Sequence, residues 1–94
     1  MSVMLVGRVR IKDLESWRDY VTGVRVSLEP FSVKTNFRGQ KLKDLSGEEP
    51  HSTIVLIEFD SPDTAIKWFN SPAYQALIPI RNQAADVQIS LYKT

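Results

Sequence analysis

Three charged residues of this chain are candidates for chemistry: Arg8, Arg38 and Glu58. The strands in which they lie alternate in polarity, which projects all three side chains onto the same face of a sheet. An arginine fork matches a carboxylate or phosphate, so Arg8 and Arg38 are predicted to bind a small organic anion. Glu58, beside apolar neighbours, is the candidate general base. An internal salt bridge between these arginines and the glutamate would give the same pattern, and both interpretations stay open.

A second group of candidates lies in the C-terminal half of the chain. Trp68 and Tyr74 flank two expected helix starts, where aromatic side chains usually belong to a core or an interface. The alternative is that Trp68 forms the wall of a cavity and that Tyr74 and Ser71 point hydroxyls into it. Ser71 precedes a proline, which favours a helix N-cap. His51 follows a turn and is expected at the surface, because it has no companion in the sequence for a metal site or a proton shuttle.

The composition excludes several classes of protein. The chain has 94 residues, 43% of them hydrophobic, with 12 basic and 11 acidic residues, one His and no Cys. This predicts a single small globular domain over residues 1–94. The near-neutral charge gives no electrostatic basis for binding nucleic acid or a membrane. No thiolate or multi-histidine site can form within one chain, and no phosphate loop or nucleophile elbow is present, so no metal or cofactor is predicted.

The expected location of the protein follows from its N-terminal sequence and its short apolar runs. The N-terminus lacks the pattern of a signal peptide, and no apolar run approaches the roughly 18–20 residues of a membrane-spanning helix. A cytoplasmic protein is therefore expected.

Hydrophobic periodicity predicts the elements that must position these residues. Strands are predicted over residues 2–11, 32–38, 53–59 and 86–93, and a helix over residues 13–28. Ser61 and Ser71, each followed by a proline, are predicted to start two further helical segments. Residues 41–45 are expected to extend the second strand, and Pro79 to end or kink the last helix. The order strand, helix, strand, strand, helix, strand is typical of the α+β ferredoxin-like fold, an antiparallel sheet with helices on one face.

The helices of this fold can cover only one face of the sheet. The strand residues expected to face them are Val3, Leu5, Val9, Phe37, Val55, Ile57, Phe59, Val87, Ile89 and Leu91. The opposite face is expected to carry Met4, Val6, Arg8, Arg10, Asn36, Arg38, Ile54, Leu56, Glu58, Gln88, Ser90 and Tyr92. The centre of that face is too apolar to be freely solvated. We therefore predict a homodimer in which a second copy packs there and completes a barrel. A half-exposed sheet covered by lysine and arginine stems is the alternative.

The sequence also carries the pattern of a known family. The residues concerned are Asp13, Trp17, Tyr20, Phe37-Arg38-Gly39, Glu58-Phe59, Trp68-Phe69, Ser71-Pro72-Ala73-Tyr74-Gln75 and Ile80-Arg81. Over nearly its whole length the chain resembles domain-of-unknown-function family 1330. Leu14 and Gln40 stand where that family usually has Pro and Gly.

The resemblance implies a ferredoxin-like dimeric α+β barrel. The wider superfamily includes cofactor-free monooxygenases, haem-degrading enzymes and small isomerases, whereas the family itself has no established activity. The recurrent polar and aromatic positions carried over to this chain are Arg38, Glu58, Trp68, Ser71, Tyr74 and Arg81.

Two functional hypotheses of different class follow. The first is a homodimeric barrel that binds a small carboxylate-bearing or otherwise anionic molecule in a cavity between sheet and helices. If it is an enzyme, isomerisation or cofactor-free oxygenation is favoured over hydrolysis. The predicted ligand-binding residues are Arg8, Arg38, Trp68, Ser71, Tyr74 and Arg81, and the predicted proton acceptor is Glu58. The second hypothesis is a homodimeric binding or interaction module without catalysis.

Overall fold

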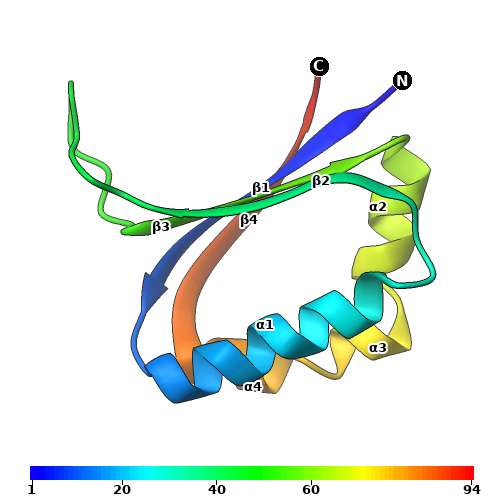
Figure 1. The fold of residues 1–94 in the computed structure, drawn as a ribbon, viewed down its shortest axis with the longest axis horizontal. Helices are drawn as coiled ribbons and strands as arrows, with labels where there is room; N and C mark the ends of the chain where they lie inside the picture. The colour runs from blue at the N-terminus through cyan, green and yellow to red at the C-terminus, as the bar shows by residue number, and fades with distance from the viewer.

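The computed structural model describes all 94 residues. The elements are β1 (Val3–Ile11), α1 (Leu14–Leu28), β2 (Val33–Gln40), β3 (Thr53–Phe59), α2 (Pro62–Phe69), α3 (Pro72–Gln75), α4 (Ile78–Ala84) and β4 (Ala85–Lys93). All strand pairs are antiparallel, in the order β2-β3-β1-β4. The helices lie together on one side of the sheet (Figure 1). This arrangement confirms the predicted ferredoxin-like fold.

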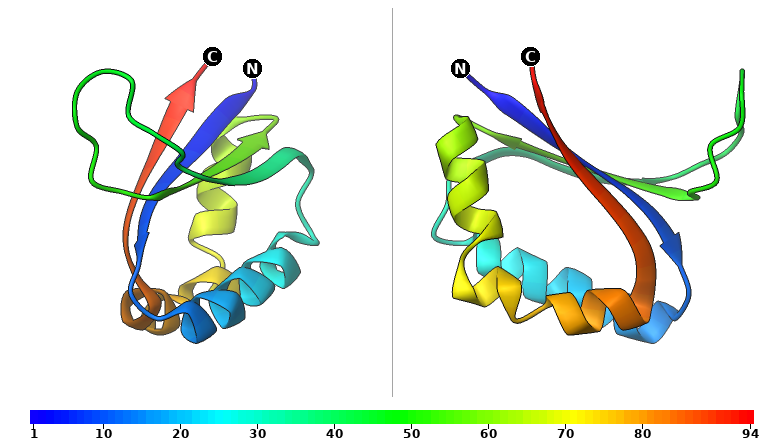
Figure 2. Two further views of the ribbon diagram at one scale, coloured as in Figure 1. Left: turned by 60° about the vertical axis from the view of Figure 1, so that its left-hand side comes forward. Right: turned by 180° about the vertical axis from the view of Figure 1, so that it is seen from behind.

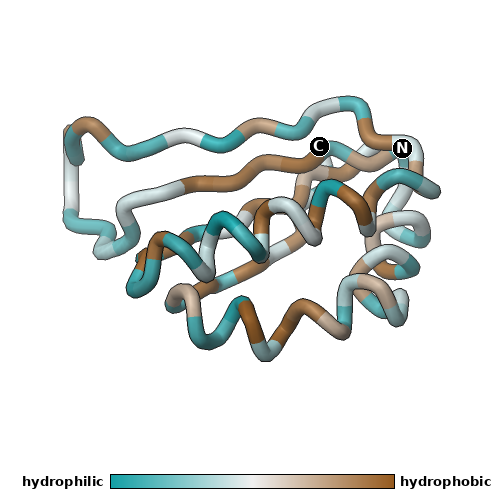
Figure 3. The backbone as a smooth tube through the Cα atoms, turned by 60° about the horizontal axis from the view of Figure 1, so that its bottom comes forward, coloured by the Kyte–Doolittle hydropathy of each residue, from teal (hydrophilic) through white to brown (hydrophobic).

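The core lies between the sheet and the helices. Figure 3 shows a run of hydrophobic residues along most of β3, Ile54 to Ile57, whereas β2 beside it is mixed. The helix side of the sheet supplies fully buried side chains such as Val3, Val9 and Phe59. Trp17 and Tyr20 of α1 cover them because the apolar residues of this helix recur every three or four positions. The layer is closed at the other end by Trp68 and Tyr74.

The helix starts after β3 follow the predicted capping pattern. Ser61 Oγ accepts a hydrogen bond from Thr64 N at 3.2 Å, and Ser71 Oγ accepts one from Tyr74 N at 3.2 Å. The helix that starts at Ser71 ends before Pro79, at Gln75, but Pro79 is not followed by a loop as expected. It lies in the first turn of a separate helix that was not predicted, α4, where the missing N–H leaves no intrahelical bond unmade.

The expected extension of β2 over residues 41–45 was also wrong. Residues 41–52 instead form a loop, which we call the arm, that projects from the sheet on the side away from the helices (Figures 1 and 2). The Nζ atom of Lys41 lies 3.0 Å from Asp44 Oδ1 and 3.4 Å from Glu49 Oε2. These contacts fold the segment back on itself and are incompatible with an extended strand.

An irregularity in β2 decides which side chains face the helices. Val33 pairs with Phe59, but Thr35 pairs with Glu58, so β2 carries one extra residue between these pairs. A one-residue slip moves every later side chain of a strand to the other face. Arg38 consequently pairs with Val55 and lies on the helix side, as does Asn36. Phe37 lies on the open face, the sheet face without helices, and is 49% exposed.

Apart from these exchanges in β2, which also bring Thr35 to the open face, this face holds the predicted residues together with Asp86. Its remaining positions follow from the register and hold Met4, Val6, Arg8, Arg10, Thr35, Ile54, Leu56, Glu58, Asp86, Gln88, Ser90 and Tyr92. Phe37, Leu56 and Val6 form an apolar row across β2, β3 and β1 at its centre.

Candidate functional site

A cavity lies between the sheet and α1. Its lining consists of Leu5, Gly7, Val9, Trp17, Tyr20, Val21, Val24, Arg25, Asn36, Arg38, Val55, Ile57, Trp68, Val87 and Ile89. The cavity has a volume of about 50 Å³, which is room for roughly three to five water molecules. Apolar side chains dominate this lining, and it contains no Asp, Glu or His. The cavity therefore suits the apolar part of a small molecule.

The mouth of this cavity is basic. A wider hollow of about 650 Å³ shares Trp17, Val21, Arg25 and Arg38 with the cavity and adds Arg18 to its lining. No acidic residue lines the mouth, and none of the three arginines forms an ion pair within the chain. Unpaired guanidinium groups around an apolar opening favour an anion at that point.

Two of these arginines were missed in the sequence. Arg18 and Arg25 are seven residues apart on α1 and therefore lie on the same side of the helix, next to its buried stripe. The seven-residue spacing was the only sign in the sequence that the two arginines belong together. It does not by itself indicate a binding site, because exposed arginines beside a buried stripe are common. The position of Arg38 in the structure shows that they lie beside the cavity.

The inner wall of the cavity includes Trp68. Its side chain is 2% exposed, and its ring centroid lies 5.8 Å from that of Phe59 and 4.5 Å from that of Tyr74. The indole Nε1 donates a hydrogen bond to Ser27 Oγ at 2.9 Å. Because this donor is already used, Trp68 offers a ligand its aromatic surface and no hydrogen bond.

Behind this wall, the buried Tyr20 and Tyr74 and the half-buried Arg81 form a chain of hydrogen bonds. Arg81 Nη1 donates to Tyr74 Oη at 3.0 Å, and the hydroxyls of Tyr74 and Tyr20 are 2.9 Å apart. Tyr20 lines the cavity, whereas Tyr74 is fully buried behind it. Burial, reinforced by the neighbouring Tyr74, raises the pKa of Tyr20 far above its usual range, so the phenol stays protonated. The arrangement fixes Tyr20 in place.

Because the pKa of the Tyr20 phenol is raised in the folded protein, we predict a loss of stability at alkaline pH. The folded protein retains this proton, whereas the unfolded chain releases it near the ordinary pKa of 10.0. The stabilisation is therefore complete below that pH and falls above it, by up to about 1.4 kcal/mol per pH unit. Urea denaturation between about pH 9 and pH 11 measures this slope. Tyr20→Phe is expected to reduce this slope, because it removes the one titrating group to which we attribute it. An identical slope in both proteins would contradict the role of Tyr20.

Arg8 and Glu58 lie on the other side of the sheet. The prediction that Arg8, Arg38 and Glu58 share one face was wrong, because the extra residue in β2 turns Arg38 toward the helices. Arg8 and Glu58 do share the open face, but Arg8 Nη1 makes a long hydrogen bond to Gln88 Oε1 (3.5 Å), and Glu58 Oε1 accepts one from Thr35 Oγ1 (3.3 Å). The alternative salt bridge between them is not formed.

Ser71 is used by the fold. Its Oγ donates to the carbonyl of Trp68 at 2.7 Å and accepts from the amide of Tyr74. These bonds confirm the capping interpretation, and Ser71 does not line the cavity.

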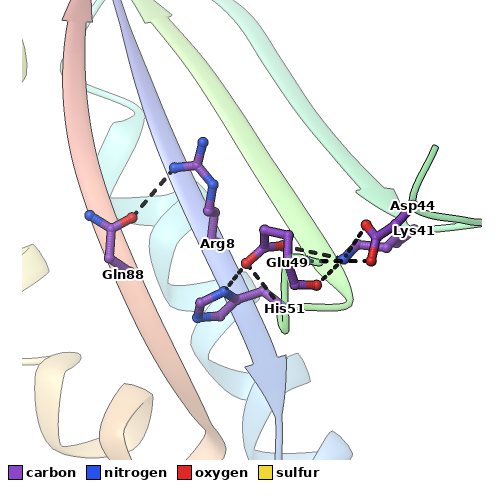
Figure 4. A network of polar contacts seen from close by, with 6 residues as sticks. All are labelled: Arg8, Lys41, Asp44, Glu49, His51 and Gln88. Carbon is purple, nitrogen blue, oxygen red and sulfur yellow. Dashed lines mark hydrogen bonds and ion pairs between the residues drawn. The ribbon is translucent and has the colours of Figure 1, made fainter. Parts of the chain in front are cut away.

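His51 lies at the base of the arm, where it is half-buried and not exposed as expected, and it pairs with Glu49 (Figure 4). Its Nδ1 bonds the carboxylate of Glu49, and this bond is the main cause that lowers the pKa of Glu49 to about 2. The same carboxylate also contacts Lys41. This network fastens the arm and lies on the open side of the sheet, away from the cavity. No group of three His, Asp or Glu side chains converges in a way that could hold a metal ion.

The fold and the cavity together define the class of protein. A four-stranded antiparallel sheet in the order β2-β3-β1-β4, with its helices on one face, is a ferredoxin-like α+β protein. The chain belongs to the DUF1330 family, described as a domain of unknown function, whose sequence profile matches residues 2–94. No curated protein matches the sequence. None of its helices has the length and apolar character needed to cross a membrane.

Several solved structures share this fold. SnoaB, a cofactor-independent oxygenase from Streptomyces nogalater, has a TM-score of 0.79 and 7% identity, over 99% of this chain and 92% of its own. RPA0582 of Rhodopseudomonas palustris, a protein of unknown function, has a TM-score of 0.83 and 18% identity, with coverages of 99% and 82%. A dimeric ferredoxin-like protein of unknown function from Thermobifida fusca has a TM-score of 0.70 and 16% identity, with coverages of 100% and 92%. At these identities the likeness establishes the fold alone.

Proposed function

We propose that this protein pairs with a second copy through its open face and binds a small organic anion in the cavity beneath the sheet. One observation carries the binding proposal: an apolar cavity opens into a mouth that holds three unpaired arginines and no acid. A carboxylate at the mouth would meet Arg38 and Arg25, while a short aliphatic group would enter the cavity and displace its water, and a larger aromatic body would stay in the wider hollow. Pairing is supported by the apolar row at the centre of the open face.

The residues of the site take distinct roles in this proposal. Arg38 supplies the charged fork from β2, and Arg25 and Arg18 supply further positive charge from α1. Trp68 is the aromatic wall. Tyr20 is held at the cavity by Tyr74 and Arg81. Glu58 and Arg8 have no part in this site, because the sheet separates them from it.

A second candidate function is oxygenation of the bound anion by molecular oxygen without a cofactor. It is favoured by the structural likeness to SnoaB and by a mouth whose positive charge would hold an acidic phenol or enol as its electron-rich anion. The lining supplies no carboxylate or imidazole as a base, so the substrate would have to bind already ionised. Oxygen consumption with such phenols and enols tests this candidate.

Thermal-shift titration with aromatic and short aliphatic carboxylates tests the binding proposal. We expect at least one carboxylate to stabilise the protein while its neutral amide does not. Arg38→Ala should raise the dissociation constant of that carboxylate by about 10- to 100-fold, because a hydrogen bond to a charged group is lost.

Arg8→Ala is the matched control, since it removes an arginine from the opposite face of the sheet. Its affinity for the carboxylate should equal that of the wild type. The binding proposal is overturned if no carboxylate stabilises the wild type, or if Arg38→Ala binds as tightly as the wild type does.

A further inference from the structure

The arm exposes two leucines completely. Leu42 and Leu45 are 101% and 93% exposed, more than any other large apolar side chain in the chain. Both lie in the arm, which rises on the open side of the sheet (Figures 1 and 2). Single exposed leucines are ordinary, but two of them three residues apart in one projecting loop leave apolar surface that their own fold does not cover.

The arm is an ordered loop. Its ends are joined by a hydrogen bond from Lys41 N to Ser52 O at 2.7 Å, and Ser52 N donates to Val9 O of β1 at 3.1 Å. The Lys41 ammonium group bridges Asp44 and Glu49, and Glu49 in turn holds His51 (Figure 4). Gly47 adopts a positive φ of 73° in the turn. These contacts restrain the backbone that carries the two leucines, which reduces the entropy lost by the arm when a partner covers it.

The surface beside the arm combines apolar side chains with both signs of charge. A groove of about 260 Å³ lies between the base of the arm and the open face; Phe37 and Ile54 are its two hydrophobic lining residues, and Arg8, Lys41 and Glu49 are its charged ones. Arg8 and Glu58 lie on the open face, and Lys43 and Glu48 lie in the arm, so both signs of charge occur in these two segments. A patch that meets its own copy around a two-fold axis must be self-complementary, and a mixture of charges permits this. A nucleic acid or an anionic membrane would instead require one sign of charge.

We propose that the arm clasps a second copy of this chain, with Leu42 and Leu45 buried against the copy that packs on the open face. This inference rests on the pairing stated in the proposed function and extends the interface from the sheet to residues 41–52. The open face and the arm then form one continuous surface on the same side of the molecule. In the dimer each copy would contribute one arm.

Sedimentation over a dilution series tests this assignment with the full chain. Leu42→Ser/Leu45→Ser is expected to raise the dimer dissociation constant by about 10- to 100-fold, because two buried leucines are lost from each arm. Leu14→Ser/Ile66→Ser is the matched control. It removes two apolar side chains that are 52% and 51% exposed on the helices, and it should leave the dissociation constant unchanged. Far-UV circular dichroism confirms that both double variants are folded.

The possible outcomes separate the arm from the pairing itself. An unchanged dissociation constant in Leu42→Ser/Leu45→Ser, together with dissociation of the dimer by a charge placed at Leu56, overturns the role of the arm and leaves pairing through the sheet intact. A wild type that stays monomeric at its highest attainable concentration overturns both. Anion binding is not measured in this assay, so a failure of the cavity proposal does not affect the result.

Discussion

Trp68→Ala is expected to lower the free energy of unfolding by about 3–5 kcal/mol. Trp68 is 2% exposed and packs against Phe59, Phe69 and Tyr74, and its indole donates to Ser27. Truncation leaves a cavity between these rings and removes the indole N–H that donates to the buried Ser27 hydroxyl. A domain of this size is typically stable by only about 5–15 kcal/mol, so the variant should be close to unfolding. Urea denaturation at a fixed protein concentration measures the loss.

Ile66→Ala is the matched control for this prediction. It removes a large apolar side chain from the same helix, α2, at a position that is 51% exposed. The loss should stay below about 1 kcal/mol, because little contact area disappears. If Trp68→Ala lost no more stability than Ile66→Ala, Trp68 would not be part of the packed core that separates the cavity from the Tyr74–Arg81 pair.

Leu56→Lys is expected to separate the proposed dimer and raise its dissociation constant by at least about 100-fold. Leu56 lies between Val6 and Phe37 in the middle row of the open face. In a dimer that packs through this face, the substitution buries an unpaired ammonium group in each copy. In the monomer the same side chain reaches water, because no helix covers this side of the sheet. The fold should therefore survive while the association is lost.

Sedimentation of Leu56→Lys measures its dimer dissociation constant. Ile66→Lys, which places the same charge on the helix side of the molecule, is the control. Ile66→Lys should behave as the wild type does. Equal association of all three proteins would show that the open face is not the interface. Leu56→Lys should also retain the anion affinity of the wild type, because the cavity lies across the sheet from this residue.

The separation of the two faces is the main functional consequence of the fold. One face, with Arg18, Arg25 and Arg38 at its edge, encloses the cavity. The other face is the one that we propose to pack, with the arm, against a second copy. The proposed ligand site and the proposed association surface therefore do not compete for the same side chains. Variants of one surface can therefore be tested without disturbing the other.

The amino-acid sequence by itself determined the elements and their order. Alternation of apolar residues identified the four strands, and serine–proline pairs at Ser61 and Ser71 identified two helix starts. These features depend on interactions within a few residues, which a linear sequence displays directly. The same patterns identified the apolar centre of the open face and the fold that leaves it uncovered.

The tertiary structure alone decided which residues meet. The extra residue in β2 follows from how that strand pairs with β3, and it moves Arg38 to the helix side and Phe37 to the open face. Arg25 of α1 meets Arg38 of β2 at the mouth of the cavity only because α1 packs on this side of the sheet. The companion of His51 and the projection of the arm depend on contacts that close the segment between β2 and β3. A strand's period of two residues amplifies a single slip into a complete exchange of faces. The alternation therefore identified β2 as a strand, while its pairing with β3 decided the side of the sheet on which Arg38 lies.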